Sequence, residues 1–173
     1  MDVETAISSR RSVRSYKDEK VPREKIEEIF ESVLMAPTTY KLQNQKFVIV
    51  DDDKIKEKLY KAANDQKFVE NAPVVVVGIT KTPESVLSSG IRAGVLNVTI
   101  ALDHLTLKAT EEGLGTCWVS GFVQEKVKKA INVPEEYEVV ALMTLGYPKR
   151  SLEEKKGRKV SLARSISYNE FSE

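Results

Sequence analysis

Pro73-Val74-Val75-Val76-Val77-Gly78-Ile79 is the stretch of sequence that decides the fold. Most of these residues are β-branched, and their hydrophobicity is continuous rather than alternating. Such a run is typical of a β-strand that is covered on both of its faces. We therefore expect residues 73–79 to form a central strand.

Two amphipathic helices are predicted on either side of this strand in the sequence. In residues 22–35, apolar side chains recur at spacings of three and four, and Pro37 ends the pattern. From about Glu84 to Glu112, a broad apolar stripe repeats at the same spacing. This second segment predicts a long helix that forms the spine of the core.

Shorter elements are predicted in the rest of the chain. Phe47–Val50 is a compact apolar run that suits a buried strand, and a helix carrying Ile55 and Leu59 follows it. Gly113–Val119 leads from the cap of the long helix into a short strand. A short helix around Val127 and a strand over Val139–Leu145 complete the pattern.

Composition limits the class of protein. The chain has 173 residues, of which 41% are hydrophobic, and this favours a single domain over residues 1–173. With 27 basic and 26 acidic residues, no global field points to nucleic acid or an anionic membrane. The start of the chain does not resemble a secretory signal, and no apolar stretch reaches the roughly 20 residues of a membrane span. We expect a cytoplasmic protein that has no membrane partner.

Catalytic side chains and metal ligands give weak signals. His104 is the sole histidine, and its place inside the long helix favours a packed structural role. Cys117 lies in an apolar run and is expected to be a buried structural thiol. Asp51-Asp52-Asp53 follows a strand and suits a turn and a helix cap. Neither a dinucleotide-binding glycine motif nor a phosphate-binding P-loop occurs, and no metal site is predicted.

The arginine cluster Arg10-Arg11-Ser12-Val13-Arg14 is the strongest binding signal. Guanidinium groups pair with phosphate oxygens in bidentate geometry, and the serine hydroxyl can add a hydrogen bond. Taken alone, the cluster could also be a solvated charged face. Together with the threonine and glutamine loop after Pro37, the glycine turn and a basic tail, it favours a protein that holds a cofactor.

Four motifs then resemble a known family. Their order is Arg-Arg-Ser-Val-Arg-Ser-Tyr at 10–16, Ala-Pro-Thr-Thr at 36–39, Gly-Leu-Gly-Thr-Cys-Trp at 113–118 and Leu-Gly-Tyr-Pro at 145–148. This order is similar to that of the FMN-dependent nitroreductase family, over roughly residues 4 to 158. The resemblance implies an α+β fold with a mixed central β-sheet flanked by helices and a long buried helix. It also implies an extended C-terminal arm, residues 149–173, that packs on the domain or on the partner subunit.

The resemblance assigns one group of residues to the phosphate end and the pyrimidine edge of FMN. Arg10, Arg11 and Ser12 would hold the phosphate and ribityl end, and Arg14 would face the pyrimidine edge of the flavin. There a positive charge stabilises the reduced flavin. In the tail, Lys156 and Arg158 match a family Lys-x-Arg that returns to the phosphate.

A second group would meet the flavin ring. Pro37, Thr38 and Thr39 resemble a segment that reaches the flavin of the partner subunit, and Gln43 accompanies it. Asn64 lies near a position whose side chain meets the ring, with an ambiguous register over residues 63–66. Backbone N–H groups following the glycine turn would bind the ring edge, and these belong to Trp118, Val119, Ser120 and Gly121.

The mouth of the site departs from the family pattern. Lys41-Leu42-Gln43-Asn44-Gln45 stands where Asn-x-Gln-Pro-Trp is usual. Because few residues separate Ile79 from the predicted long helix, the lid of larger members cannot be built. We expect an open mouth shaped by Tyr40, Lys41 and residues 80–90, in a short, lid-poor member of the family.

The activity implied is that of a homodimeric flavoprotein oxidoreductase. Hydride would pass from NADH or NADPH to flavin N5, and then to a nitroaromatic, quinone or similar acceptor, by a ping-pong mechanism. A non-enzymatic flavin-binding module stays open as an alternative. So does a flavin-cleaving or dehalogenating relative on the same fold.

Overall fold

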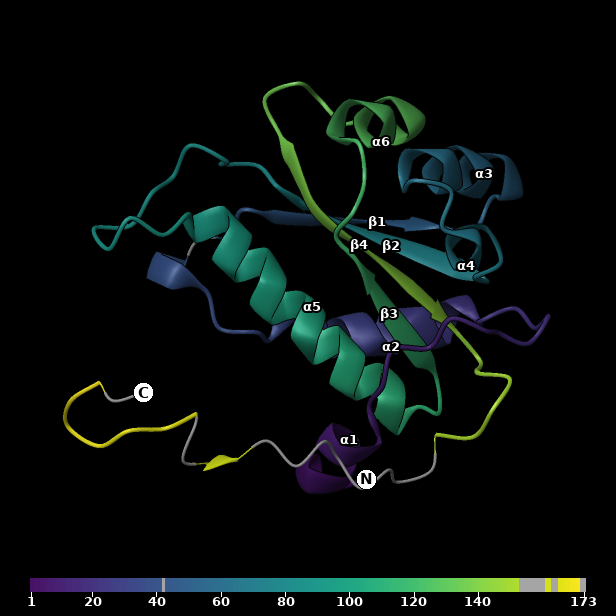
Figure 1. Ribbon diagram of the computed structural model, residues 1–173. Coiled ribbons are helices and arrows are strands. Elements are labelled where there is room, and N and C mark those ends of the chain that lie inside the picture. Colours follow the sequence, from purple (N-terminus) through teal and green to yellow (C-terminus); the bar gives the residue numbers. More distant parts are fainter. Residues whose placement is uncertain (42, 153–160, 163–164, 172–173) are drawn as a thin grey trace.

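Helices and strands alternate along the chain (Figure 1). The computed structural model describes residues 1–41, 43–152, 161–162 and 165–171. The helices are α1 (Val3–Ser9), α2 (Arg23–Leu34), α3 (Asp53–Ala62), α4 (Lys67–Glu70), α5 (Ala93–Glu111) and α6 (Gln124–Ile131), with a 3-10 turn, η1, over Thr39–Lys41. The strands are β1 (Gln45–Val50), β2 (Val74–Thr80), β3 (Gly115–Val119) and β4 (Glu138–Gly146).

The four strands form one sheet in the order β1-β2-β4-β3. Strand β2 is interior and every residue of it is buried, which confirms the prediction from its continuous hydrophobicity. The α+β class is confirmed as well. The sheet was expected to be mixed, but its neighbouring strands all pair antiparallel. Among the described residues, the one parallel pairing is an isolated bridge between Ser12 and Thr116, and it lies outside the four strands at Ser12.

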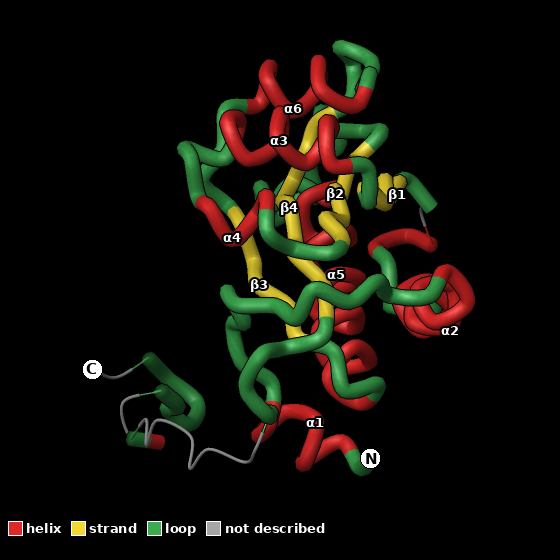
Figure 2. The backbone as a smooth tube through the Cα atoms, turned by 90° about the vertical axis from the view of Figure 1, so that its right-hand side faces the viewer, coloured by secondary structure: helices red, strands yellow, loops and turns green. Residues whose placement is uncertain are grey.

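Helices cover both faces of the sheet and create two cores (Figures 1 and 2). Val74 and Val76 of β2 pack toward α2 and α5. Val75 and Val77 pack toward α3, α4 and α6. Because successive strand residues point to opposite faces, a strand with apolar residues at both sets of positions belongs in the middle layer.

Helix α5 begins later than the sequence pattern predicts. It starts at Ala93 rather than near Glu84, and residues 81–92 form a loop in which Val86 bridges to Arg92. Gly90 has a φ of +83°, which interrupts any helix there, and Ile91 is 53% exposed. The expectation that few residues separate β2 from the long helix is therefore wrong, because the whole loop 81–92 lies between them. This loop contains no helix.

The centre of α5 lies directly against β2 (Figure 1). Gly78 permits this contact, because a Cβ atom at that position would lie 2.8 Å from Cγ1 of Val98. Ten residues of α5 are buried, among them Leu102 and Leu105, so the prediction of a long buried helix is confirmed. No helix in the described part of the chain is long and apolar enough to cross a membrane.

Two short helices were not predicted. Helix α1 begins after Asp2, whose carboxylate accepts a hydrogen bond from the backbone N–H of Thr5 at 2.7 Å. Helix α4 is a single turn. Both are too short to show a clear apolar period.

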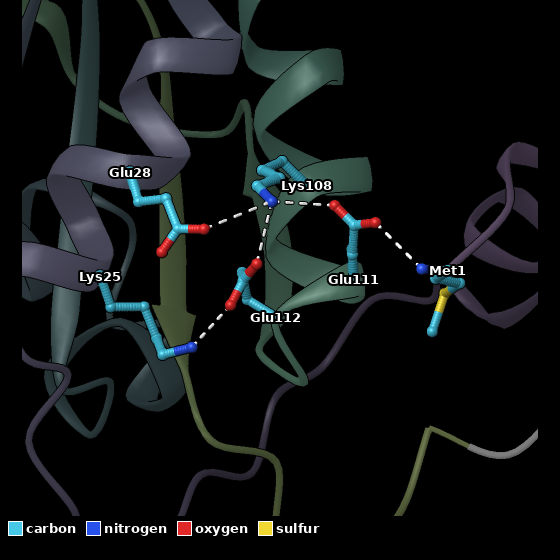
Figure 3. A network of polar contacts seen from close by, with 6 residues as sticks. All are labelled: Met1, Lys25, Glu28, Lys108, Glu111 and Glu112. Carbon is cyan, nitrogen blue, oxygen red and sulfur yellow. Dashed lines mark hydrogen bonds and ion pairs between the residues drawn. The ribbon is translucent and has the colours of Figure 1, made fainter.

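Ion pairs tie α2 to the end of α5 (Figure 3). Lys25 and Lys108 each donate a hydrogen bond to the Glu112 carboxylate, at 2.7 and 2.9 Å. Nζ of Lys108 also lies 3.6 Å from Oε1 of Glu28. The hydrogen bond from Lys25, followed by that from Lys108, lowers the pKa of Glu112 to about 2. Glu112 therefore stays ionised wherever the protein is folded at ordinary pH.

The C-terminal segment runs along the outside of the molecule where it is described (Figure 1). Its apolar side chains face solvent, with Tyr168 83% and Phe171 87% exposed. Packing of this arm on the domain or on the partner subunit stays a prediction.

Candidate cofactor site

The arginine segment is seated against the edge strand β3. The backbone N–H of Val13 donates to the carbonyl oxygen of Thr116 at 2.8 Å. Gly115 allows the close approach, because a Cβ atom there would lie 2.5 Å from Cγ2 of Val13. The segment that carries the arginines is thus attached beside the glycine turn.

The buried hydroxyl group of Tyr16 fixes the backbone of the same segment. The Tyr16 hydroxyl donates to the carbonyl oxygen of Val13 at 2.6 Å and is also hydrogen-bonded to the Thr144 hydroxyl of β4, at 2.6 Å. Tyr16 is only 5% exposed, and burial raises its pKa far above the usual range. The phenol therefore stays neutral. Its hydrogen bond to Val13 holds in place the backbone that carries Ser12 and Arg14.

The guanidinium groups of the segment are free to bind an anion. Arg14 and Ser12 are exposed, and Arg10 and Arg11 are partly exposed. None of the ion pairs between described residues involves one of these arginines. An arginine cluster without carboxylate partners suits a phosphate group.

The outer edge of β3 presents backbone groups beside the arginines. The Thr116 carbonyl points to Val13 and hence away from β4, and backbone groups alternate in direction along a strand. The backbone of Trp118 therefore faces the outer edge as well, whereas that of Val119 faces β4, where it is paired with Leu142. Among the predicted backbone donors, this geometry favours Trp118. Ser120 and Gly121 follow in an exposed loop.

Asn64 lies across from that loop. Asn64 and Asp65 have φ values of 54° and 55°, so the chain reverses sharply after α3. Gln66 uses its side-chain amide within the protein, donating to the carbonyls of Ala63 at 2.9 Å and Gly121 at 3.2 Å. Asn64 is exposed. Within the ambiguous register, the structure therefore favours Asn64 as the residue with an available amide.

The threonine segment is anchored elsewhere, at the start of α5. The Thr39 N–H and hydroxyl both donate to Oδ1 of Asn97, at 2.9 and 3.2 Å. Thr38 is half-buried, while the remaining predicted residues are exposed: Pro37, Lys41 and Gln43. Tyr40 lies inside η1.

The two predicted halves of the site lie at opposite ends of the sheet. Thr39 of η1 is hydrogen-bonded to Asn97, which is hydrogen-bonded to Asn44 just before β1. The turn therefore lies at the end of the sheet where β1 begins and where Thr80 of β2 pairs with Glu138 of β4. The arginine segment lies at the other end, beside the Gly115–Gly146 pair. Between them, β4 spans nine residues, roughly 26 Å at about 3.3 Å per residue. One chain does not bring both halves together.

Other predicted features lie as follows. Cys117 is 1% exposed, and burial raises the pKa of its thiol. His104 lies in α5 with Nδ1 3.2 Å from the carbonyl oxygen of Ile100. Asp52 caps α3 by accepting from the N–H of Ile55 at 2.9 Å. Lys156 and Arg158 lie outside the described residues, and no group of metal-ligating side chains was found within the described ones.

A cavity of about 710 Å³ adjoins the arginine segment without coinciding with the predicted site. It shares Arg14 with that site and extends past Lys17 to Lys56. Sequence reasoning missed Phe68, whose ring lies under Arg14 with its centre 5.6 Å from the guanidinium carbon. It also missed Asn97. Neither residue carries a motif signal.

The sequence profile of the Nitroreductase family matches residues 7–88 and 64–147. The chain belongs to the nitroreductase family. Among curated relatives, it is 31% identical to the "NADH dehydrogenase" of Thermus thermophilus, over 86% of this chain and 87% of that one. It is 29% identical to the "FMN reductase [NAD(P)H]" of Bacillus subtilis, over 85% of this chain and 66% of that one.

Solved nitroreductase structures share the fold. The nitroreductase family protein of Clostridium novyi NT superposes with a TM-score of 0.80 at 31% identity, over 89% of this chain and 91% of that chain. The resemblance seen in the four motifs is thereby confirmed at the level of family and fold.

Proposed function

We propose that the chain is an FMN-dependent oxidoreductase that takes hydride from NADH or NADPH and passes it to nitroaromatic, quinone or similar acceptors. The observation that carries this proposal is the seating of the arginine segment against the outer edge of β3. Membership of the nitroreductase family and the names of relatives, which include an NADH dehydrogenase and an FMN reductase, support it.

The donor set fits FMN. A phosphate needs cationic groups and N–H or O–H donors, which Arg10, Arg11 and Ser12 supply in one exposed or partly exposed segment. The polar edge of a flavin needs hydrogen-bond donors in one plane, and the outward-facing Trp118 backbone lies next along the same strand edge. Arg14 follows in the same segment, and its guanidinium group lies over the Phe68 ring.

Each residue then has a distinct task. When bound, FMN supplies the two-electron carrier that amino-acid side chains lack. Arg10, Arg11 and Ser12 bind the phosphate, and Arg14 stabilises negative charge at the pyrimidine edge. No side chain is assigned to move a proton. Donor and acceptor occupy the same mouth in turn, which is a ping-pong scheme.

The proposed unit is a homodimer with two shared sites. Because the arginine segment and η1 lie at opposite ends of one sheet, the turn of a second copy is needed beside each arginine segment. Leu34 and Met35, just before Pro37, are 66% and 82% exposed. Exposed apolar side chains of this kind suit a contact with a second copy of the chain.

Colour and reduction test the cofactor. Purified or FMN-reconstituted protein should absorb near about 450 nm and lose this band when NADH or NADPH is added without oxygen. Protein that stays colourless after reconstitution contradicts the proposal. Yellow protein that neither nucleotide reduces supports the binding-module alternative instead. Parallel lines in double-reciprocal plots would support the ping-pong order.

Subunit mixing tests the shared site. An Arg10→Ala chain and a Thr38→Ala/Thr39→Ala chain should each bind FMN weakly as homodimers. In a mixed dimer, one site has both defects and the other has neither. We expect one tightly bound FMN per mixed dimer. No gain on mixing would show that each site is built within one chain.

A further inference from the structure

A chain of buried amides and hydroxyls joins the turn η1 to α5 and β1. Asn97 is fully buried and Asn44 is 5% exposed. Oδ1 of Asn97 accepts both donors of Thr39, and its Nδ2 donates to Oδ1 of Asn44 at 3.2 Å. The Asn44 amide in turn donates to the hydroxyl of Thr82. This set of Thr39, Asn97, Asn44 and Thr82 is called the amide chain below.

The turn needs such an anchor. With three residues, η1 is too short to be stable through its own hydrogen bonds. Pro37, which precedes the turn, and Lys41, which is its last residue, are exposed, and Lys41 has a φ of 55°. The two hydrogen bonds from Thr39 to a single buried oxygen are therefore the polar contacts that fix the turn on the body of the protein.

The anchor itself is rigid. Gly94, one turn before Asn97, lies so close to β2 that a Cβ atom there would overlap the side chain of Thr80. Helix α5 is therefore tightly packed against the end of β2 at this point. Through Thr82, the amide chain also reaches the loop 81–92, and the Asn44 carbonyl accepts from the N–H of Lys81 at 2.8 Å. Both segments expected at the mouth are thus attached to the same two amides.

We propose that Asn97 is a positioning residue of the flavin site, which sets the placement of Thr38 and Thr39 through the amide chain. The proposal rests on the proposed function, in which these threonines meet FMN. Asn97 contacts neither FMN nor substrate in this scheme. Its effect reaches the cofactor through the turn that carries Thr38 and Thr39.

The hydrogen-bond directions suggest a pair of variants. Leucine at position 97 is similar in size to asparagine but leaves Thr39 without an acceptor. Aspartate can still accept both donors of Thr39. The Asn44 amide can reverse and donate to the aspartate, and the Thr82 hydroxyl can then donate to Asn44. Asn97→Leu therefore breaks the amide chain, whereas Asn97→Asp preserves it.

The experiment compares FMN dissociation constants of full-length variants, measured by quenching of flavin fluorescence, with their melting temperatures. Thr106→Val is the matched control, because Thr106 is 1% exposed in the same helix and its hydroxyl bonds only locally, to Asp103. We expect Asn97→Leu to weaken FMN binding roughly tenfold or more, since two donors lose their acceptor. Asn97→Asp should stay within about threefold of the original protein, and Thr106→Val within about twofold.

The outcomes separate the two proposals. An original protein that does not bind FMN contradicts the proposed function itself. If it binds FMN but Asn97→Leu binds equally well, the positioning role is wrong. The same holds if Asn97→Asp loses as much affinity as Asn97→Leu, or if Thr106→Val loses as much at a similar melting temperature. Should Asn97→Leu not fold, Asn97→Ser, which is too short to reach Thr39, takes its place with the same expected loss.

Discussion

The guanidinium carbon of Arg14 lies 5.6 Å from the centre of the Phe68 ring, over its face. Phe68 belongs to the single turn of α4, and Arg14 comes from the segment docked on β3. The cation–π contact therefore joins two elements that are distant in sequence. The contact with the Phe68 ring also restricts the positions that the guanidinium group of Arg14 can take.

Replacing Phe68 by leucine should weaken FMN binding about three- to fivefold. A cation–π contact at an exposed site contributes about 0.5–1 kcal/mol, and without the ring Arg14 loses its orientation. Titration of apoprotein with FMN measures the effect. Phe68→Tyr keeps an aromatic face and should bind FMN like the original protein. Equal losses in both variants would contradict an orienting role for the ring.

Tyr16→Phe should lower the free energy of unfolding by about 1–2 kcal/mol. The variant keeps the buried ring but leaves the Val13 carbonyl and the Thr144 hydroxyl without their shared partner. Urea unfolding followed by tryptophan fluorescence would measure it. Tyr168→Phe, at a position that is 83% exposed, is the control and should not change stability.

Gly115→Ala should displace the arginine segment. The added Cβ would meet Val13 at 2.5 Å, and such overpacking costs about 1–3 kcal/mol. We expect lower stability together with weaker FMN binding. The double variant Gly115→Ala/Val13→Ala opens room for the new methyl group and should recover part of both losses. If the two substitutions change stability and FMN binding additively, relief of the clash does not depend on the Val13 side chain.

The ion pairs at the end of α5 should make stability depend on acid pH. The pKa of Glu112 is about 2 in the folded protein and returns to its ordinary value of 4.5 when the chain unfolds. Its contribution is therefore complete above about pH 4.5 and is lost as the pH falls toward 2. The thermal midpoint, measured from pH 6 to pH 2.5, should fall over this window.

Glu112→Gln removes that contribution. At pH 7 we expect it to destabilise the protein by about 1 kcal/mol, since the carboxylate is shared by two lysines but lies near the surface. Its stability curve should be flatter below pH 4.5. Glu27→Gln, which breaks an exposed pair with Arg23, is the control and should leave the acid slope unchanged. Identical slopes for all three proteins would assign the acid sensitivity to other carboxylates.

Local patterns in the sequence predicted most of the fold. Strand β2 and helix α2 were recognised because hydrophobic periodicity reports burial directly. The same rule failed at residues 84–92, where Leu87 and Ile91 have helical spacing by coincidence. There the left-handed backbone at Gly90 determines the structure instead. Antiparallel pairing throughout the sheet could not be read from strand hydrophobicity alone.

The candidate site was predictable only where it forms a contiguous motif. Arg10 to Arg14 stand together in the sequence and indicate an anion without any structural knowledge. Asn97 and Phe68 act through contacts with residues 58 and 54 positions away, Thr39 and Arg14. No local pattern reports such a contact, because it arises only when the sheet brings the elements together.

Helix α5 determines which motions are available to the protein. It carries Asn97 near one end and Lys108 at the other, and its middle is sealed between β2 and α2. Its central amide hydrogens should therefore exchange with solvent only when the whole molecule unfolds. Any displacement of the turn η1 on a faster timescale must then break the hydrogen bonds of Thr39 to Asn97 while helix α5 stays in place.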